Sequence, residues 1–269
     1  MRTIRWLVGA FMTVLLAAPA GAQAVPAPAD ETKPATIHLI GDSTVRNGND
    51  SGGGELWGWG HFLGESVDPA RFRVANHAIG GRSSRTFRSE GRWDRVVARL
   101  TPGDRVVIQF GHNDGGPLDG PKGRASLKGV GPETRSIEQG GRPAEEVHTY
   151  GWYLARYVRE ARAKGARPVV LSPVPRNIWT PEGKVARASR DYGRWAREVA
   201  EAEGAEFVDL NELVARRYEA LGREAVGRDL FTATDHTHTT RSGAKLNASC
   251  VAEGLKASHD AAVAAAIAP

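Results

Sequence analysis

Four short polar motifs contain the residue types that hydrolysis of an ester requires. They are Gly41-Asp42-Ser43-Thr44, Gly80-Gly81-Arg82-Ser83, Gly111-His112-Asn113-Asp114 and Asp235-His236-Thr237-His238. Ester hydrolysis needs a nucleophile, a base that activates it, an acid that orients the base, and hydrogen-bond donors for the oxyanion. Together the four motifs supply each of these parts.

The candidate nucleophile is Ser43, because it directly follows a β-branched apolar run and a turn at that point would expose its hydroxyl group. Gly41 would allow the sharp bend before it. The alternative interpretation is that residues 42–44 cap a helix, which is the commoner use of such residues.

The candidate base is His238, which would take the proton of Ser43 and return it to the leaving oxygen. Asp235 would hold the tautomer of the His238 ring, and their separation of three residues suits a single turn. His238 could instead be a surface or capping residue near the start of a helix. His236 is the competing base, but a side chain adjacent to Asp235 would point away from that carboxylate.

The candidate oxyanion donors are the backbone N–H of Ser43, the backbone N–H of Gly81 and the side-chain amide of Asn113. Gly81 has no Cβ, so a substrate can approach its backbone, and Asn113 is a neutral donor. Taken singly, Gly80-Gly81 would be a plain turn and Asn113 an Asx turn. Their placement after successive strands favours the oxyanion role.

The elements that position these motifs alternate between strands and helices. Predicted strands cover 36–40, 72–75, 105–110, 168–171 and 206–210, and predicted helices cover 93–100, 150–164, 189–203, 212–220 and 242–258. The alternation predicts an α/β fold in which helices cover both faces of a five-stranded parallel sheet. Because the motifs follow strands, we expect them to meet at one edge of that sheet. The Gly- and Pro-rich connection 115–148 is expected to close over a site or to be mobile.

The N-terminus predicts export. Residues 1–24 have the pattern of a signal peptide, with Arg2 and Arg5 before an apolar run and an Ala22-Gln23-Ala24 cleavage site. Residues 25–35 read as a flexible lead-in and 36–269 as a single domain. The apolar run is too short to span a bilayer, so we expect a secreted or periplasmic monomer with no membrane association after cleavage.

Charge and cysteine content exclude several classes of function. The chain has 36 basic and 31 acidic residues, a formal charge of +5 that falls to +3 without the two arginines of the signal segment, which is no signature of nucleic-acid binding. Cys250 is the single cysteine, so neither an intramolecular disulfide nor a thiolate zinc cluster can form. We expect Cys250 to lie inside a helix, and we expect no metal or other cofactor.

The order of the four motifs resembles that of the SGNH (GDSL-like) hydrolases. Three further segments, NHAIGGRSSRTF at 76–87, RASLKG at 124–129 and VHTYGWYL at 147–154, are similar to bacterial rhamnogalacturonan acetylesterases of carbohydrate esterase family 12. This resemblance implies a flavodoxin-like three-layer α/β/α sandwich, with the serine, glycine, asparagine, aspartate and histidine in the roles given above. One departure is Thr239-Thr240-Arg241, where the last two places would be Ser and Pro.

The resemblance implies removal of O-acetyl groups from the rhamnogalacturonan backbone of pectin. Arg82 and Arg85, together with Arg88, are expected to meet galacturonate carboxylates. His112 is expected to contact the substrate, and Trp179 is expected to stack on sugar rings. The arginines could equally form a solvated face, and tryptophans are more often part of a core.

Three other functions remain open. Acetyl xylan esterase activity is the alternative that spacing cannot separate from the first. A remoter one is a metal-dependent phosphoesterase built on Asp235, His236, His238, His112 and Asp114. The last is a carbohydrate-binding protein that has lost catalysis.

Overall fold

Five parallel strands form the central sheet, in the spatial order β2-β1-β3-β6-β7. They are β1 (Ala35–Gly41), β2 (Phe72–Asn76), β3 (Arg105–Gln109), β6 (Arg167–Leu171) and β7 (Glu206–Val208). The predicted sheet is confirmed, and each predicted strand overlaps an observed one. The order changes direction between β1 and β3, which is where open α/β sheets bind ligands beyond the carboxyl ends of their strands.

The computed structural model describes residues 33–46, 56–139, 142–187 and 190–268. The predicted signal peptide (1–24) and most of the predicted lead-in (25–35) lie outside these ranges. Within the ranges, no helix combines the length and the apolar character needed to cross a membrane.

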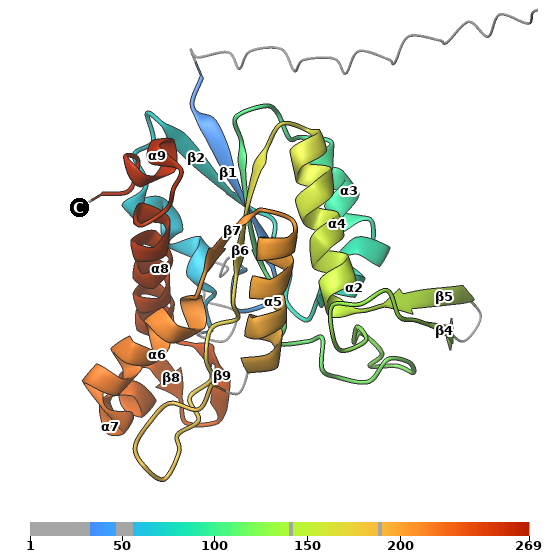
Figure 1. Ribbon diagram of the computed structural model, residues 1–269. Helices are drawn as coiled ribbons and strands as arrows, with labels where there is room; N and C mark the ends of the chain where they lie inside the picture. Colours follow the sequence, from blue (N-terminus) through green and yellow to red (C-terminus); the bar gives the residue numbers. More distant parts are fainter. Residues whose placement is uncertain (1–32, 47–55, 140–141, 188–189, 269) are drawn as a thin grey trace, which may run out of the picture.

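Helices cover both faces of the sheet (Figure 1). On one side lie α3 (Arg92–Val97), α4 (Tyr150–Ala163) and α5 (Arg190–Ala202), and on the other lie α6 (Leu210–Leu221) and α8 (Arg241–Lys256). Shorter helical elements are α2 (Ser84–Ser89), α7 (Arg223–Ala225), α9 (Ala261–Ala264), η1 (Trp59–His61), η2 (Leu63–Ser66) and η3 (Val226–Leu230). The result is the α/β/α sandwich that the sequence predicts.

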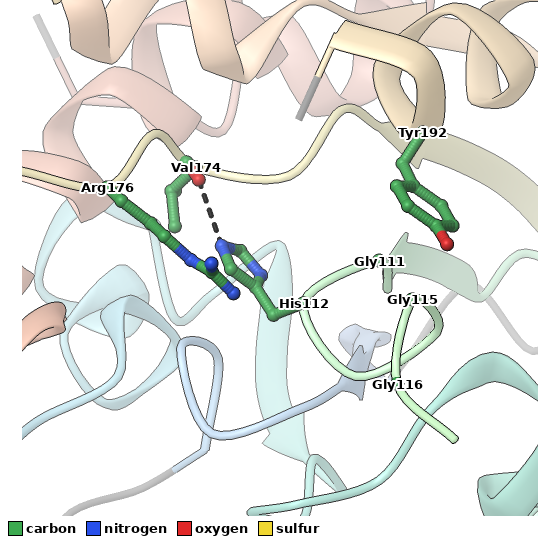
Figure 2. Close-up of a pocket in the computed structure, with 7 residues that line it drawn as sticks. All are labelled: Gly111, His112, Gly115, Gly116, Val174, Arg176 and Tyr192. Atoms are coloured by element: carbon green, nitrogen blue, oxygen red, sulfur yellow. Dashed lines mark hydrogen bonds between the residues drawn. The ribbon is translucent and has the colours of Figure 1, made fainter. Parts of the chain in front are cut away.

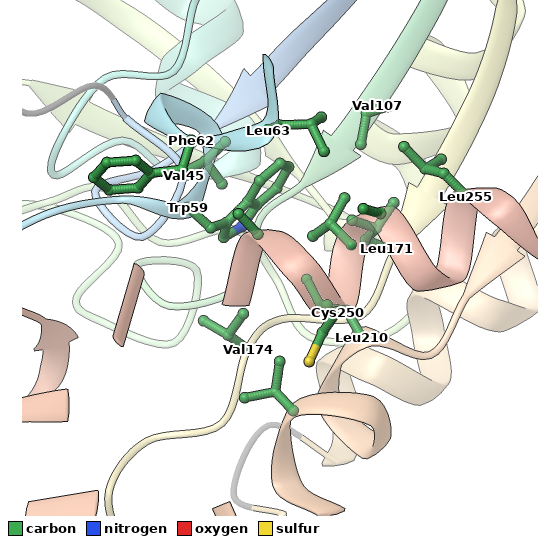
Figure 3. Packing of buried hydrophobic residues seen from close by; sticks show 14 of the residues in the cluster. Val45, Trp59, Phe62, Leu63, Val107, Leu171, Val174, Leu210, Cys250 and Leu255 are labelled. Atoms are coloured by element: carbon green, nitrogen blue, oxygen red, sulfur yellow. The ribbon is translucent and has the colours of Figure 1, made fainter. Parts of the chain in front are cut away.

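Alternate side chains of the strands enter two separate apolar cores, because successive residues of a strand face opposite sides of the sheet. Ile37 and Leu39 of β1 belong to the core that packs on α6 and α8, whereas Ile40 belongs to the core under α4 and α5. Figure 3 shows part of the first core, which includes Cys250. Cys250 is buried in α8, as predicted, and burial raises the pKa of its thiol to about 11.

The connection 115–148 contains an antiparallel pair of strands that the sequence analysis did not predict. β4 (Thr134–Gln139) pairs with β5 (Arg142–His148), and the pair projects from the side of the main sheet in Figure 1. Ile137 and Val147 are buried, while the other described side chains of the two strands are exposed or half-exposed. Because only one described side chain of each strand is buried, the sequence of this pair lacks the alternation of apolar and polar residues that predicts a strand.

Arg85 of α2 holds this hairpin against the helical layer. Its side chain is 1% exposed, and the guanidinium donates to both carboxylate oxygens of Glu145 in β5 at 2.8 Å. It also donates to the carbonyl oxygens of Leu118 and Ala125, each at 2.8 Å. The prediction that Arg85 meets substrate carboxylates is therefore wrong, because its donors are already bonded inside the protein.

Replacing Arg85 with alanine should lower the free energy of unfolding by about 3 kcal/mol or more, because one partner of a buried ion pair is removed and two buried carbonyl groups lose their donor. Urea denaturation of the wild type and of Arg85→Ala measures this loss. The matched control is Arg95→Ala, at an exposed position of α3, which should change the value by less than about 0.5 kcal/mol. A similarly small effect at Arg85 would contradict the structural role.

Candidate active site

Ser43, His238 and Asp235 form a continuous chain of hydrogen bonds. Ser43 Oγ lies 2.8 Å from His238 Nε2, and His238 Nδ1 lies 2.7 Å from Asp235 Oδ2. Because a carboxylate only accepts hydrogen bonds, His238 Nδ1 carries the proton and Nε2 presents its lone pair to the Ser43 hydroxyl. The structure therefore brings the three predicted residues together in the orientation that activates a serine.

Asp235 is held in place by the backbone that follows it. Its Oδ1 accepts the N–H groups of Thr237 at 2.7 Å and of His238 at 2.9 Å, which leaves Oδ2 for the His238 ring. Burial works to raise the pKa of Asp235, but the hydrogen bonds from His238 and Thr237 outweigh it and hold that pKa below its ordinary value. Asp235 is thus kept ionised, as an orienting acid must be.

The segment that carries Asp235 and His238 is a strand rather than the predicted turn. β9 (Asp235–Thr239) pairs with β8 (Phe231–Thr232). The Trp57 N–H donates to Thr239 O at 2.8 Å, and the Thr239 hydroxyl donates to Trp57 O at 3.0 Å. His236 has an exposed side chain, so the structure favours His238 over His236 as the base.

The residues after β9, where the sequence departs from the family pattern, begin α8. The Thr240 hydroxyl accepts the N–H of Gly243, so a threonine caps this helix as a serine would. Arg241 stands at the first helical position, where proline is also favoured. Its guanidinium lies 5.3 Å from the ring centroids of Trp57 and Phe62, so the departure keeps a contact that anchors the start of the helix.

Ser43 occupies a tight turn at the end of β1. The carbonyl oxygen of Asp42 accepts the N–H groups of Val45 at 3.2 Å and of Arg46 at 3.0 Å, which closes the turn around the serine. A Cβ at Gly41 would lie 2.6 Å from both the carbonyl oxygen of Gln109 and a methyl group of Val45. Glycine is therefore needed at position 41 because β3 and the turn approach it closely.

Buried polar groups fix this turn from below. Asp42 is fully buried, and its Oδ1 accepts the Thr44 N–H at 2.9 Å and the Thr44 hydroxyl at 2.8 Å. The Gln109 amide donates to Thr44 Oγ1 at 2.7 Å, and the Trp59 indole donates to Gln109 Oε1 at 2.9 Å. No sequence pattern indicates that Gln109 and Trp59 support the turn of Ser43, because their partners lie far away along the chain.

His112 connects the third motif to the first. Its Nδ1 lies 3.3 Å from Asp42 Oδ2, and its Nε2 lies 3.0 Å from the carbonyl oxygen of Val174. Burial would raise the pKa of Asp42, but the positive potential and hydrogen bond of His112, together with the hydrogen bonds of Thr44, hold it below its ordinary value. The motif of Ser43 and that of Asn113 are thereby joined through the interior.

The candidate oxyanion donors lie on segments that meet at Ser43. Gly81 has φ of +77°, in the left-handed region that favours glycine, and a Cβ at Gly80 would lie 3.7 Å from Ser43 Cβ. Neither Ser43 nor Gly81 donates its backbone N–H to another residue within the described ranges. The Asn113 amide donates to the carbonyl oxygen of Arg82 at 3.0 Å and retains a second N–H. This arrangement can receive a developing oxyanion.

Two predicted substrate contacts already have partners in the protein. The Arg82 guanidinium lies 3.1 Å from Glu90 and donates to the carbonyl oxygen of Gly80 at 2.9 Å. Trp179 is half-buried against the core of α6 and α8, and its indole N–H donates to Asn177 at 2.7 Å. This geometry does not test whether Arg82 or Trp179 contacts the substrate, so the two contacts stay predictions.

The proposed metal site does not assemble. Among the described residues, no three His, Cys, Asp or Glu side chains are arranged to hold a metal ion. Of the residues that the metal alternative requires, His236 is exposed, His238 is engaged with Ser43 and Asp235, and Asp114 is fully buried. The geometry therefore disfavours that alternative.

Asp114 instead links three segments around Asn113. It accepts the N–H and the hydroxyl of Ser84, at the start of α2, and the hydroxyl of Ser126 at 3.0 Å. Burial raises the pKa of Asp114 to about 6, and the hydrogen bonds from Ser84 and Ser126 only partly oppose that rise.

The Asp114 carboxyl should make stability depend on pH. Its pKa is about 6 in the folded protein and 3.8 ordinarily, so its contribution to stability is fully present below pH 4 and is lost as the pH rises through 6. Relative to Asp114→Asn, which does not titrate, the wild type should gain about 2 kcal/mol on going from pH 7.5 to pH 4.5. Urea denaturation of both proteins at the two pH values measures the gain, and an unchanged difference would contradict the shifted pKa.

A pocket of about 330 Å³ opens beside this site (Figure 2). It is lined by Gly111, His112, Gly115, Gly116, Val174, Arg176 and Tyr192. His112 is among the predicted substrate contacts, whereas Arg176 and Tyr192 are not. Ligands bind beyond the carboxyl ends of parallel strands, and this rule indicated the other motifs. Arg176 follows β6 closely, so the same rule could have indicated Arg176.

Comparison with known proteins gives one matching family. The model of the GDSL-like lipase/acylhydrolase family matches residues 39–246, which contain all four motifs. A rhamnogalacturonan acetylesterase of Emericella nidulans is 36% identical over 211 residues, covering 78% of this chain and 80% of that protein. A probable rhamnogalacturonan acetylesterase of Bacillus subtilis, YesY, is 34% identical over 223 residues, covering 82% of this chain and 92% of that protein.

Solved structures that resemble this one include proteins of Bacillus subtilis and of Geobacillus stearothermophilus. The Bacillus subtilis protein YxiM has a TM-score of 0.70 at 27% identity, and the match covers 86% of this chain but 58% of the length of that one. The acetylxylan esterase Axe2 of Geobacillus stearothermophilus has a TM-score of 0.57 at 21% identity, with 83% of this chain and 95% of that one covered. The likeness to Axe2 shows a shared fold.

Proposed function

The chain belongs to the GDSL-like lipase/acylhydrolase (SGNH) family of carboxylic ester hydrolases, and we propose that it removes O-acetyl groups from a plant cell-wall polysaccharide through an acetyl-enzyme on Ser43. The observation that carries this proposal is the chain of hydrogen bonds from Ser43 through His238 to Asp235, at 2.8 and 2.7 Å.

The acylation step follows from which atoms carry protons: Ser43 Oγ and His238 Nδ1 carry one each, and His238 Nε2 is free to accept one. Ser43 Oγ attacks the acetyl carbonyl carbon while His238 Nε2 takes the hydroxyl proton, and Asp235 stabilises the imidazolium that forms. The N–H groups of Ser43, Gly81 and Asn113 receive the oxyanion, and each such donor typically lowers the activation barrier by ~3 kcal/mol. The tetrahedral intermediate collapses as His238 returns the proton to the leaving sugar oxygen, which releases a free hydroxyl group.

Deacylation repeats these steps with water. His238 takes a proton from a water molecule, whose oxygen attacks the acetyl-enzyme carbonyl, and the same donors hold the second oxyanion. The bond to Ser43 Oγ then breaks, the proton returns to the serine, and acetate leaves. The reaction needs no cofactor, since every proton passes between Ser43, His238, the leaving sugar oxygen and water.

The substrate we propose is the acetylated rhamnogalacturonan backbone of pectin. Two relatives that share 36% and 34% identity with this chain are named rhamnogalacturonan acetylesterases, one of them as probable. This supports placing the chain with carbohydrate esterase family 12. An acetyl xylan esterase remains the alternative, and a binding protein without activity is distinguished from both by release of acetate.

We also propose the setting in which this enzyme works. Residues 1–24 would direct export and be removed, and residues 36–269 would act as a single, monomeric catalytic domain that is secreted or periplasmic. The basis for this proposal is the charged, then apolar, then small-residue pattern of the N-terminus. Mass spectrometry of the exported protein would locate the cleavage site.

Ser43→Ala should lower kcat/KM for acetate release by at least about a thousandfold, because no other group can form the acyl-enzyme. Urea denaturation should show that the variant is folded. Ser249→Ala, at an exposed position of α8, is the matched control and should retain full activity. A fluorophosphonate should label Ser43 of the wild type, and substantial turnover by Ser43→Ala would refute covalent catalysis at this residue.

A comparison of polysaccharides tests the substrate. Acetate release from acetylated rhamnogalacturonan, homogalacturonan and xylan should show kcat/KM at least about tenfold higher on rhamnogalacturonan, a preference of about 1.4 kcal/mol. Equal or better activity on xylan would favour the alternative substrate. Hydrolysis of 4-nitrophenyl acetate without acetate release from any polysaccharide would reject the carbohydrate substrate but not the esterase.

A further inference from the structure

The pocket adjoins the candidate active site, because its lining residues Gly111 and His112 belong to the motif of Asn113. His112, which lines it, precedes Asn113 and lies 3.3 Å from Asp42, the neighbour of Ser43. The segment of Val174 and Arg176, which contacts His112, continues to Asn177, whose N–H donates to the carbonyl oxygen of His236 at 2.8 Å. A group bound in this pocket would therefore be part of a molecule whose ester lies at Ser43.

The charge in this pocket is not neutralised by its own lining. The seven lining residues include Arg176 and no carboxylate. The Arg176 side chain is half-exposed, and it makes no hydrogen bond or ion pair with any residue in the described ranges. Arg82, Arg85 and Arg88, in contrast, each bind a glutamate. A guanidinium without an acidic partner can bind a carboxylate through two parallel hydrogen bonds.

The far side of the pocket carries a second donor. Tyr192 Oη is shielded from solvent and has no hydrogen-bond partner among the described residues. Burial, together with the negative potential of Asp114 and Asp191, raises the pKa of Tyr192 to about 12, so the hydroxyl stays protonated. A Cβ at Gly115 would lie 3.1 Å from Tyr192 Oη, so a side chain at that position would crowd this hydroxyl.

Figure 2 shows Arg176 beside His112 on one side of the pocket and Tyr192 close to Gly111 and Gly115 on the other. An occupant that spans Arg176 and Tyr192 has an anionic group at one end and a hydrogen-bond acceptor at the other. A pocket of about 330 Å³ is at the small end of ligand sites. A uronic acid ring has these features, since it carries a carboxylate and several hydroxyl and ring oxygens.

We propose that this pocket is a subsite for a uronic acid residue of the acetylated polysaccharide, in which Arg176 binds the carboxylate and Tyr192 donates to a hydroxyl or ring oxygen. The inference rests on the proposed function and names the feature by which an acidic polysaccharide is preferred over a neutral one. Arg176 and Tyr192 are binding residues here and take no part in the transfer of protons.

The first test is inhibition, because it needs no polysaccharide deacetylation. Oligogalacturonate without acetyl groups should inhibit hydrolysis of 4-nitrophenyl acetate by the wild type competitively. Arg176→Gln should raise the inhibition constant at least about tenfold, and Arg176→Lys should raise it less, because lysine keeps the charge but loses the paired geometry. Arg223→Gln, at an exposed position of α7, is the matched control and should leave the constant unchanged.

The second test compares charged with neutralised substrate. Acetylated oligogalacturonides and their methyl esters differ in the carboxylate charge and in one methyl group. The ratio of their kcat/KM values should be at least about ten in the wild type and fall to about one in Arg176→Gln, mainly through KM. High salt should reduce the wild-type ratio, because screening weakens the attraction between guanidinium and carboxylate. Tyr192→Phe should raise KM for both substrates by a similar factor.

The outcomes separate the subsite from the proposed function. No inhibition of the wild type, or the same inhibition constant in Arg176→Gln, would overturn the subsite. A wild type that fails to deacetylate rhamnogalacturonan but shows inhibition that depends on Arg176 would overturn the proposed substrate while supporting the subsite. Circular dichroism of each variant confirms that a lost effect is not a lost fold.

Discussion

The hydrogen bond between Ser43 Oγ and His238 Nε2 joins segments 195 residues apart, and the rest of the site depends on its length of 2.8 Å. Neither residue can adjust to the other, because each is fixed by separate contacts. The serine is held by the turn closed on Asp42, whereas the histidine is held by β9, which pairs with β8 and Trp57. Because both segments are attached to one rigid sheet edge, the serine and the histidine are positioned within a few tenths of an ångström of the distance that catalysis requires.

Two buried carboxyl groups support this geometry in opposite ways. Hydrogen bonds and the nearby His112 hold the pKa of Asp42 below its ordinary value, so Asp42 braces the turn of Ser43 as an anion. Burial raises the pKa of Asp114 to about 6, and repulsion from Asp42 adds to that rise. Environments that separate the pKa values of neighbouring carboxyl groups assign them different roles. Asp42 is a permanent charge, while Asp114 titrates near neutral pH.

The sheet was predictable because the central strands β1, β3 and β6 are apolar on both faces. The candidate site was predictable because three of its motifs follow β1, β2 and β3 and the fourth, in β9, precedes α8. Other features depend on partners that no local pattern reveals. Arg85 resembles a surface arginine in sequence, and only the fold supplies Glu145 and two carbonyl groups around it. The β4–β5 hairpin buries one apolar residue per strand, which is too little signal for periodicity.

The position of unneutralised charge carries more functional information than its amount. The formal charge of +5 says little, since Arg82, Arg85 and Arg88 close to the second motif are each paired with a glutamate. Those pairs leave the charges of the three arginines compensated. Arg176 follows β6 without such a partner in the described ranges, across the pocket from a hydroxyl that also lacks one. Because no carboxylate among the described residues compensates this guanidinium, its position favours an anionic ligand over a structural role.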